Sequence, residues 1–138
     1  MPLPNTCIVG IGIDVVATDR IARVLDEQRE AFEERVFTAA ERETCAGRAD
    51  RVHALGARLA AKEACGKALG TGLGQGVAFQ HIEVVENAAG KPELRLSGAA
   101  AARAQALGVR RIHVSLTHDD GVSAAVVVLE GQDLSPPG

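Results

Sequence analysis

The feature that most constrains this chain is a helix of about 20 residues near its middle. We expect it to run from residue 50 to residue 69, where the sequence is rich in Ala and Leu, which favour helix. Four glycines follow within the seven residues from Gly70 to Gly76, and glycine at this density ends a helix. We expect the remaining elements to be wrapped around this helix.

Strands and shorter helices are predicted on both sides of it. Residues 7–16 alternate β-branched residues with glycine, which is typical of a buried strand that another backbone approaches closely. Thr18 is expected to cap a helix that runs to about residue 28, and a capping box at 38–41 predicts a short helix. The remaining predicted elements are strands 80–86 and 92–96 around a turn at 87–90, a helix from 97 to 107, and a hairpin of strands 111–117 and 122–129.

The order of these elements is strand, helices, hairpin, helix, hairpin. It predicts an α+β fold with a mainly antiparallel sheet, not a repeating βαβ pattern. A chain of 138 residues suits one domain, which we place at 1–130. The tail 131–138 contains two prolines and is expected to be disordered.

Composition argues against several classes of protein. The net charge is -3 and aromatic residues make up 2% of the chain, so neither a basic surface nor stacking platforms for nucleic acid are expected. No apolar run is long enough to span a membrane, and the first residues do not resemble a secretory signal. Three cysteines without a CxxC spacing indicate free thiols in a reducing compartment, so we expect a cytoplasmic protein.

Charged residues lie on an otherwise apolar stripe of the long helix. Four residues are spaced four apart and share one face: Leu55, Leu59, Glu63 and Lys67. A core helix normally keeps charges off its buried face, although a Glu63–Lys67 surface ion pair is an alternative. Arg58 and Lys62 form a second pair at this spacing, and both are positive. Such a pair favours an anion, such as a phosphate, between the two side chains.

Asp14 is a carboxylate inside the apolar strand at 7–16. A buried carboxylate is costly unless it is paired or binds a metal, although Asp14 could instead cap the following helix. Carboxylates from two elements with lysines nearby suit Mg²⁺ and phosphates, so Asp14 and Glu63 are the candidate metal ligands. The glycine loop does not match a phosphate-binding motif, but amides from Gly70 onward could still contact a phosphate.

Five segments carry a resemblance to a known family: GIGIDVV (10–16), FTAAE (37–41), RLAAKEACGKALGTGLG (58–74), IEVVENAAGKPELRLSG (82–98) and HVSLTHDDGVSAAVVVLE (113–130). In order and spacing the sequence resembles the holo-acyl-carrier-protein synthases, the bacterial phosphopantetheinyl transferases. The resemblance implies that phosphopantetheine passes from coenzyme A to a serine of apo-acyl carrier protein, in fatty-acid or polyketide biosynthesis. It also implies that adenosine 3′,5′-bisphosphate leaves.

The resemblance assigns a role to each candidate residue. It implies that Mg²⁺ bridges Asp14, Glu63 and the pyrophosphate. It places the cofactor against Arg58, Lys62, Lys67, Gly70 and His118. The serine proton could pass to Glu63, to Lys67 or to a water on the metal. The resemblance further implies a homotrimer with active sites between subunits.

On the first helix the family offers a basic face to the carrier protein. Arg20 and Arg23 fit that role, although several carboxylates crowd the same region. A non-catalytic trimer that binds coenzyme A or a nucleotide is the main alternative function. A Mg²⁺-dependent phosphohydrolase is a weaker one.

Overall fold

The structure is a computed structural model that describes residues 6–132. Its elements, in chain order, are β1 (Thr6–Ala17), α1 (Thr18–Val36), α2 (Ala39–Cys45), α3 (Arg51–Leu69), the short 3₁₀ helix η1 (Phe79–His81), β2 (Ile82–Glu86), β3 (Pro92–Leu96), α4 (Gly98–Ala106), β4 (Val109–Asp119) and β5 (Val122–Gln132). This order confirms the predicted α+β class with antiparallel pairing.

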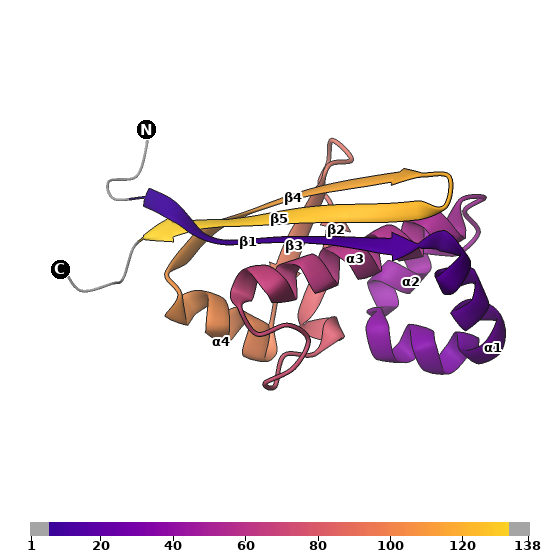
Figure 1. The fold of residues 1–138 in the computed structure, drawn as a ribbon, viewed down its shortest axis with the longest axis horizontal. Coiled ribbons are helices and arrows are strands. Elements are labelled where there is room, and N and C mark those ends of the chain that lie inside the picture. The colour runs from indigo at the N-terminus through magenta and orange to yellow at the C-terminus, as the bar shows by residue number, and fades with distance from the viewer. Residues whose placement is uncertain (1–5, 133–138) are drawn as a thin grey trace.

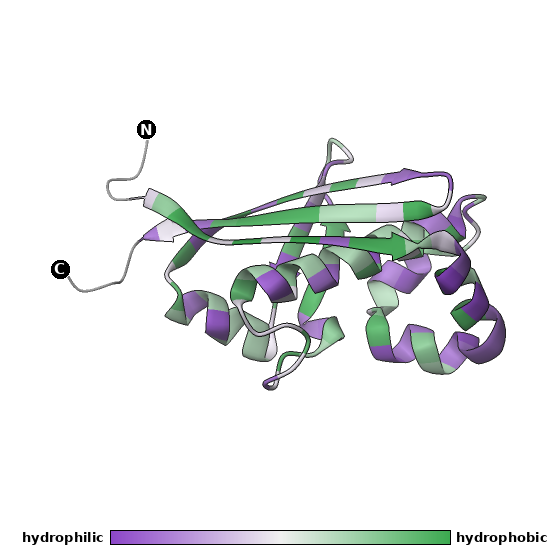
Figure 2. Ribbon diagram, in the orientation of Figure 1, coloured by the Kyte–Doolittle hydropathy of each residue, from purple (hydrophilic) through white to green (hydrophobic). Residues whose placement is uncertain are grey.

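The strands form two sheets instead of one. The larger sheet has the order β1-β5-β4 and the smaller one pairs β2 with β3, and all pairs are antiparallel. Figure 1 shows the three long strands lying together over α3, with α4 near one end of the molecule and α1 and α2 near the other. The strand β5 is hydrophobic along most of its length because it is the middle strand and packs on α3 (Figure 2).

Glycines let α3 come unusually close to β1. A Cβ atom at Gly12 would lie 1.9 Å from the carbonyl oxygen of Ala64, and one at Gly10 would lie 2.1 Å from that of Ala68. No side chain fits at these distances, so only glycine permits the contact. This confirms the prediction that another backbone approaches this strand.

The helix α3 supplies much of the core. Of its residues, those from Ala54 to Lys62 are all buried, and the small residues that follow pack against the sheet. Within residues 6–132, no helix is long and apolar enough to cross a membrane.

Several predicted boundaries were wrong. The first helix continues past residue 28 to Val36, with non-helical φ and ψ at Gln28 marking a kink, because Phe32 and Val36 are buried against the core. Thr18 is the first helical residue and not the cap; Ala17 occupies the cap position. The strand β5 extends through Gln132, where the tail was expected, because Gly131 and Gln132 pair with β1; residues 133–138 of the predicted tail lie outside the described residues.

Candidate active site

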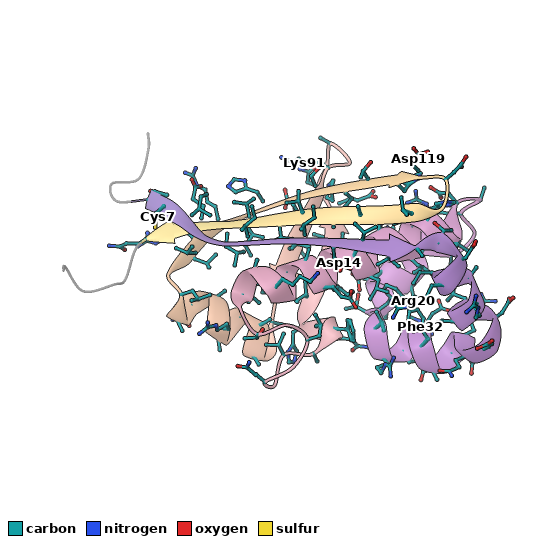
Figure 3. All side chains as sticks on the ribbon, in the orientation of Figure 1. Cys7, Asp14, Arg20, Phe32, Lys91 and Asp119 are labelled. Carbon is teal, nitrogen blue, oxygen red and sulfur yellow. The ribbon has the colours of Figure 1, made fainter. Side chains whose placement is uncertain are left out.

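Asp14 lies against α3 because it follows Gly12 by two residues and therefore points to the same face of the sheet. Figure 3 shows Asp14 on the side of β1 that α3 covers. The Nζ atom of Lys67 donates hydrogen bonds to Asp14 Oδ1 at 3.1 Å and to the carbonyl oxygen of Ile13 at 3.0 Å. The predicted helix-cap alternative for Asp14 is therefore wrong, because β1 continues for three residues beyond it.

The carboxyl groups of Glu63 and Asp14 lie close enough to interact directly. The pKa of Glu63 is raised from its ordinary 4.5 to about 7, first by burial and then by the hydrogen bond and negative charge of Asp14. The positive charges of Arg20 and Lys67 oppose this rise in the pKa. Two carboxylates that repel each other form a site that is short of positive charge.

The second oxygen of Asp14 is a buried acceptor whose hydrogen-bonding capacity is unused within residues 6–132. Oδ2 is buried, and no donor in the described part of the chain makes a hydrogen bond to it. A buried acceptor without a partner is costly, and a cation held between the two carboxylates would remove that cost. Residues 6–132 contain no cluster of three or more metal-ligating side chains. Two carboxylates nevertheless fit Mg²⁺, which keeps several waters and takes its other ligands from phosphate oxygens.

A second part of the candidate site is a cavity of about 200 Å³. Its lining includes Arg58 from α3, Glu86 from β2 and His118 from β4. Residues separated by up to 70 positions in the chain thus meet around one hollow. The structure therefore brings together Arg58 and His118, which the sequence resemblance places at the cofactor.

Arg58 is 5% exposed and its guanidinium is only partly satisfied. One nitrogen donates to the carbonyl oxygen of Ala54 at 3.1 Å, and another lies 3.7 Å from a carboxylate oxygen of Glu86. Its Nε atom is buried and donates to no acceptor among the described residues. A buried cation with a spare donor at a cavity wall is suited to binding an anion such as a phosphate.

His118 is exposed at the rim of this cavity, at the end of β4. Its ring centroid lies 5.1 Å from that of His53 on α3, with the two rings tilted by 40°. The contact holds the His118 ring over the first turn of α3, beside the cavity that Arg58 lines.

Lys62 is not part of the lining of the Arg58 cavity. Its ammonium group is fully buried and forms an ion pair with Glu41 Oε1 at 2.8 Å. The spacing of Arg58 and Lys62 predicts an anion beside them. For Lys62 that anion is the carboxylate of Glu41. The structure does not bring Lys62 together with Asp14 and Glu63 on a solvent-exposed surface.

Gly70 ends α3 in the left-handed conformation with φ of 80°. Its amide donates to the carbonyl oxygen of Lys67 at 3.0 Å, which is the expected arrangement at a helix end. That amide is therefore already used within the protein.

Arg20 and Arg23 lie exposed on the first turns of α1. Figure 3 shows Arg20 on α1, on the same side of β1 as Asp14, and its charge acts on Glu63. A basic surface thus begins next to the carboxylate pair. The exposed residues that follow toward Gln28 are Asp26 and Glu27, so this basic surface is short.

Sequence reasoning missed three acidic residues around α3. Glu41 was assigned only to a capping box, Asp50 only to a helix start, and Glu86 only to a strand. The structure places Glu41 against Lys62 and the other two in the lining of the Arg58 cavity. The pair of positive charges at Arg58 and Lys62 was the one sequence feature that indicated a nearby anion.

The fold and the site define the class of protein. Residues 10–127 match the 4′-phosphopantetheinyl transferase superfamily, which is most of the chain, and the chain belongs to that family. At the level of individual relatives, it is 47% identical over 135 residues to the holo-[acyl-carrier-protein] synthase of Methylobacterium radiotolerans, with 95% of this chain and 99% of that protein covered.

Solved structures agree with this assignment. The holo-[acyl-carrier-protein] synthase of Neisseria meningitidis superposes with a TM-score of 0.82 at 34% identity, covering 89% of this chain and 98% of the other. The enzyme of Bacillus anthracis, in complex with CoA (3′,5′-ADP), superposes with a TM-score of 0.75 at 38% identity, covering 91% and 98%.

Proposed function

We propose that this protein transfers the 4′-phosphopantetheine group of coenzyme A to a serine of apo-acyl carrier protein, and that adenosine 3′,5′-bisphosphate leaves. The observation that carries the proposal is the juxtaposition of the Asp14 and Glu63 carboxyl groups, with a buried Asp14 oxygen that no donor among the described residues reaches, beside Lys67. The names of the similar proteins and the coenzyme A complex of one of them support it.

The cavity at Arg58 is the proposed site for the adenosine end of coenzyme A. The spare Nε donor of Arg58 and the ring of His118 at the rim suit the 3′-phosphate of that end. Glu86 opposes part of the charge of Arg58, so a bound phosphate would compete with it. Anchoring the cofactor far from the reacting bond supplies binding energy that holds the pyrophosphate in place.

Asp14 and Glu63 are the proposed ligands of Mg²⁺. When bound, the ion would neutralise charge on the pyrophosphate and favour departure of the phosphate leaving group. Lys67 now compensates the charge of Asp14 and is 56% exposed, so its ammonium is free to turn toward a phosphate oxygen. We assign that contact to Lys67.

In the transfer step, the carrier's serine oxygen forms a bond to the β-phosphorus of coenzyme A. The bond between that phosphorus and the bridging oxygen breaks, and adenosine 3′,5′-bisphosphate leaves with the electron pair. We assign uptake of the serine proton to the Glu63 carboxylate, one of the three acceptors that the resemblance leaves open. No nucleophile from the protein is required.

Arg20 and Arg23 are the proposed docking residues for the carrier protein. They are exposed on α1, and Arg20 lies where its charge reaches Glu63. A carrier bound there would present its serine beside the carboxylate pair. Their positive charge suits an acidic partner.

A homotrimer is the proposed assembly. Three large apolar side chains lie on the face of β1 that points away from α3, and they are 66%, 64% and 60% exposed: Ile11, Ile13 and Val15. Such a row of exposed β-branched residues normally lies in a contact with another chain. We place the protein in the cytoplasm, since all three cysteines are free.

The test is a transfer assay read by mass spectrometry. The protein is mixed with coenzyme A, Mg²⁺ and an apo-carrier protein, and we expect the carrier to gain the mass of one phosphopantetheine group. A carrier whose serine is replaced by alanine is the control and should gain nothing. Binding of coenzyme A without any transfer would favour the non-catalytic alternative, and phosphate release without a carrier would favour a phosphohydrolase. Light scattering would test the trimer by its mass.

A further inference from the structure

Lys62 is an unusual residue because its charged end is completely buried. Its Nζ atom contacts three oxygens: Glu41 Oε1 at 2.8 Å, the carbonyl of Phe79 at 3.1 Å and the carbonyl of Ile82 at 2.5 Å. An ammonium group has three protons to donate, so its hydrogen-bonding capacity is filled by the protein. It also lies 5.9 Å from the centre of the Phe37 ring. No donor remains for a phosphate.

Glu41 is equally buried and equally satisfied. Its side chain accepts a hydrogen bond from the backbone amide of Thr38, the N-cap of α2, at 2.9 Å, and another from the amide of Val84, in the middle of β2, at 2.8 Å. A single ion pair therefore connects α3 and α2 with η1 and β2. Removal of either partner would leave the other as an uncompensated charge in the core.

The strand held by this pair is also a wall of the Arg58 cavity. Val84 and Glu86 of β2 line the cavity, and a carboxylate oxygen of Glu86 lies 3.7 Å from the Arg58 guanidinium. The Glu41 side chain holds Val84 directly, and Lys62 holds Ile82 two residues before it. The position of β2 against α3 thus depends on the Lys62–Glu41 pair.

We infer that Lys62 and Glu41 act together as positioning residues for the cofactor pocket: their buried ion pair fixes β2 against α3 and so sets the cavity in which Arg58 binds the adenosine end of coenzyme A. Lys62 does not contact the phosphates itself. The inference rests on the proposed use of that cavity. It goes beyond the phosphate-binding role that the sequence resemblance implies for Lys62.

The two roles predict opposite results for Glu41. If Lys62 binds a phosphate, the change Glu41→Gln frees its ammonium and leaves coenzyme A binding unchanged or tighter. If Lys62 is a positioning residue, Glu41→Gln and Lys62→Met weaken binding alike. In that case the double variant, in which neither buried charge remains, recovers most of the loss because the two effects are coupled.

The experiment measures KM for coenzyme A, kcat and binding of adenosine 3′,5′-bisphosphate in the full-length protein. For each single variant we expect KM to rise about tenfold, the bisphosphate to bind about tenfold more weakly, and kcat at saturating coenzyme A to stay within about threefold, because Asp14 and Glu63 are untouched. The double variant should return KM to within about threefold of the wild type.

Glu33→Gln provides a matched control. Glu33 is another buried carboxylate, 6% exposed, and it pairs with Arg51 at 2.5 Å on the side of α3 that faces α1. This variant should lose stability with no change in KM for coenzyme A. If Lys62→Met does not fold, Glu41→Gln and the double variant decide the question on their own.

Two results would overturn the inference: an unchanged KM in Glu41→Gln, or a double variant at least as impaired as Glu41→Gln. Failure of the proposed function is separately visible, because the wild-type protein would then transfer nothing to the carrier.

Discussion

Two clusters of charged side chains flank α3, and they are built in opposite ways. In the first, Lys62 and Glu41 are buried, carry opposite charges and form hydrogen bonds both to each other and to the backbone. In the second, Asp14 and Glu63 carry like charges, and one oxygen of Asp14 has no donor among residues 6–132. Each cluster takes one of two consecutive residues of α3: Lys62 belongs to the first cluster and Glu63 to the second.

The difference between the clusters is the basis for proposing a structural role for the first and a catalytic role for the second. A satisfied buried pair contributes to one specific packing arrangement, and nothing more is needed to explain it. A pair of repelling carboxylates costs stability in the folded protein, so it is expected where a ligand relieves it. Adjacent charged residues on one helix can therefore serve two purposes, according to the face on which each lies.

The largest expected effect is loss of transfer when the carboxylate pair is broken. Asp14→Asn or Glu63→Gln should lower kcat/KM by about 10²- to 10⁴-fold, because a metal site contributes several kcal/mol to the transition state. Circular dichroism should show an unchanged fold. A rate near that of the wild type in either variant would remove that residue from the site.

A smaller effect is expected at the cavity. Arg58→Ala removes charge-assisted hydrogen bonds worth about 1.5–3 kcal/mol, so KM for coenzyme A should rise about 10- to 100-fold. With coenzyme A that lacks its 3′-phosphate, the same variant should show nearly the KM of the wild type, because the wild-type Arg58 then has no phosphate to bind. Equal losses against both cofactors would place the phosphate elsewhere.

The response to Mg²⁺ should distinguish the two clusters without any measurement of activity. At a concentration of about 100 times its Kd, Mg²⁺ should stabilise the wild-type protein by about 2.7 kcal/mol. The shift in Tm should vanish in Asp14→Asn and persist in Glu33→Gln, whose buried carboxylate lies outside the pair. A shift that survives in Asp14→Asn would mean that the ion binds at another place.

The smallest expected effect is a gain of stability in an inactive variant. Because the pKa of Glu63 is raised from 4.5 to about 7, the folded protein binds more protons than the unfolded chain between these values. Stability in the absence of metal should therefore fall as the pH rises from 4.5 to 7, and the loss should persist above pH 7.

Glu63→Gln removes this penalty. After allowance for solvent screening, we expect it to be about 1–2 kcal/mol more stable than the wild type at pH 8 without Mg²⁺. The difference should disappear below pH 4.5. Urea unfolding at the two pH values measures it, and a variant less stable than the wild type at pH 8 would contradict the repulsion between the carboxyl groups.

Much of the fold was predictable from local patterns. The alternation of glycine with β-branched residues in β1, the capping box at Thr38 and Glu41, and the glycine that ends α3 each reflect forces between residues close in sequence. The predictions failed where tertiary contacts prevail. The helix α1 continues past its kink because Phe32 and Val36 are buried against the core.

The candidate site was predictable in part for the same reason. Asp14 and Glu63 could be chosen from sequence because a carboxylate in an apolar strand and a charge on an apolar stripe are both costly without a partner. Lys62 shows the limit of that reasoning. Its charge demanded an anion, and the sequence could not show that the anion was Glu41, 21 positions earlier, and not a phosphate.

The sequence by itself determined the class of the fold, the candidate residues for the chemistry and the close approach of another backbone to β1, because each follows from local propensity or from the cost of burying a charge. Only the tertiary structure decided which charges satisfy one another. Ion pairs form between residues that the packing of helices and strands brings within a few ångströms, and that packing places Lys62 in the core while Glu63, its neighbour in sequence, faces Asp14.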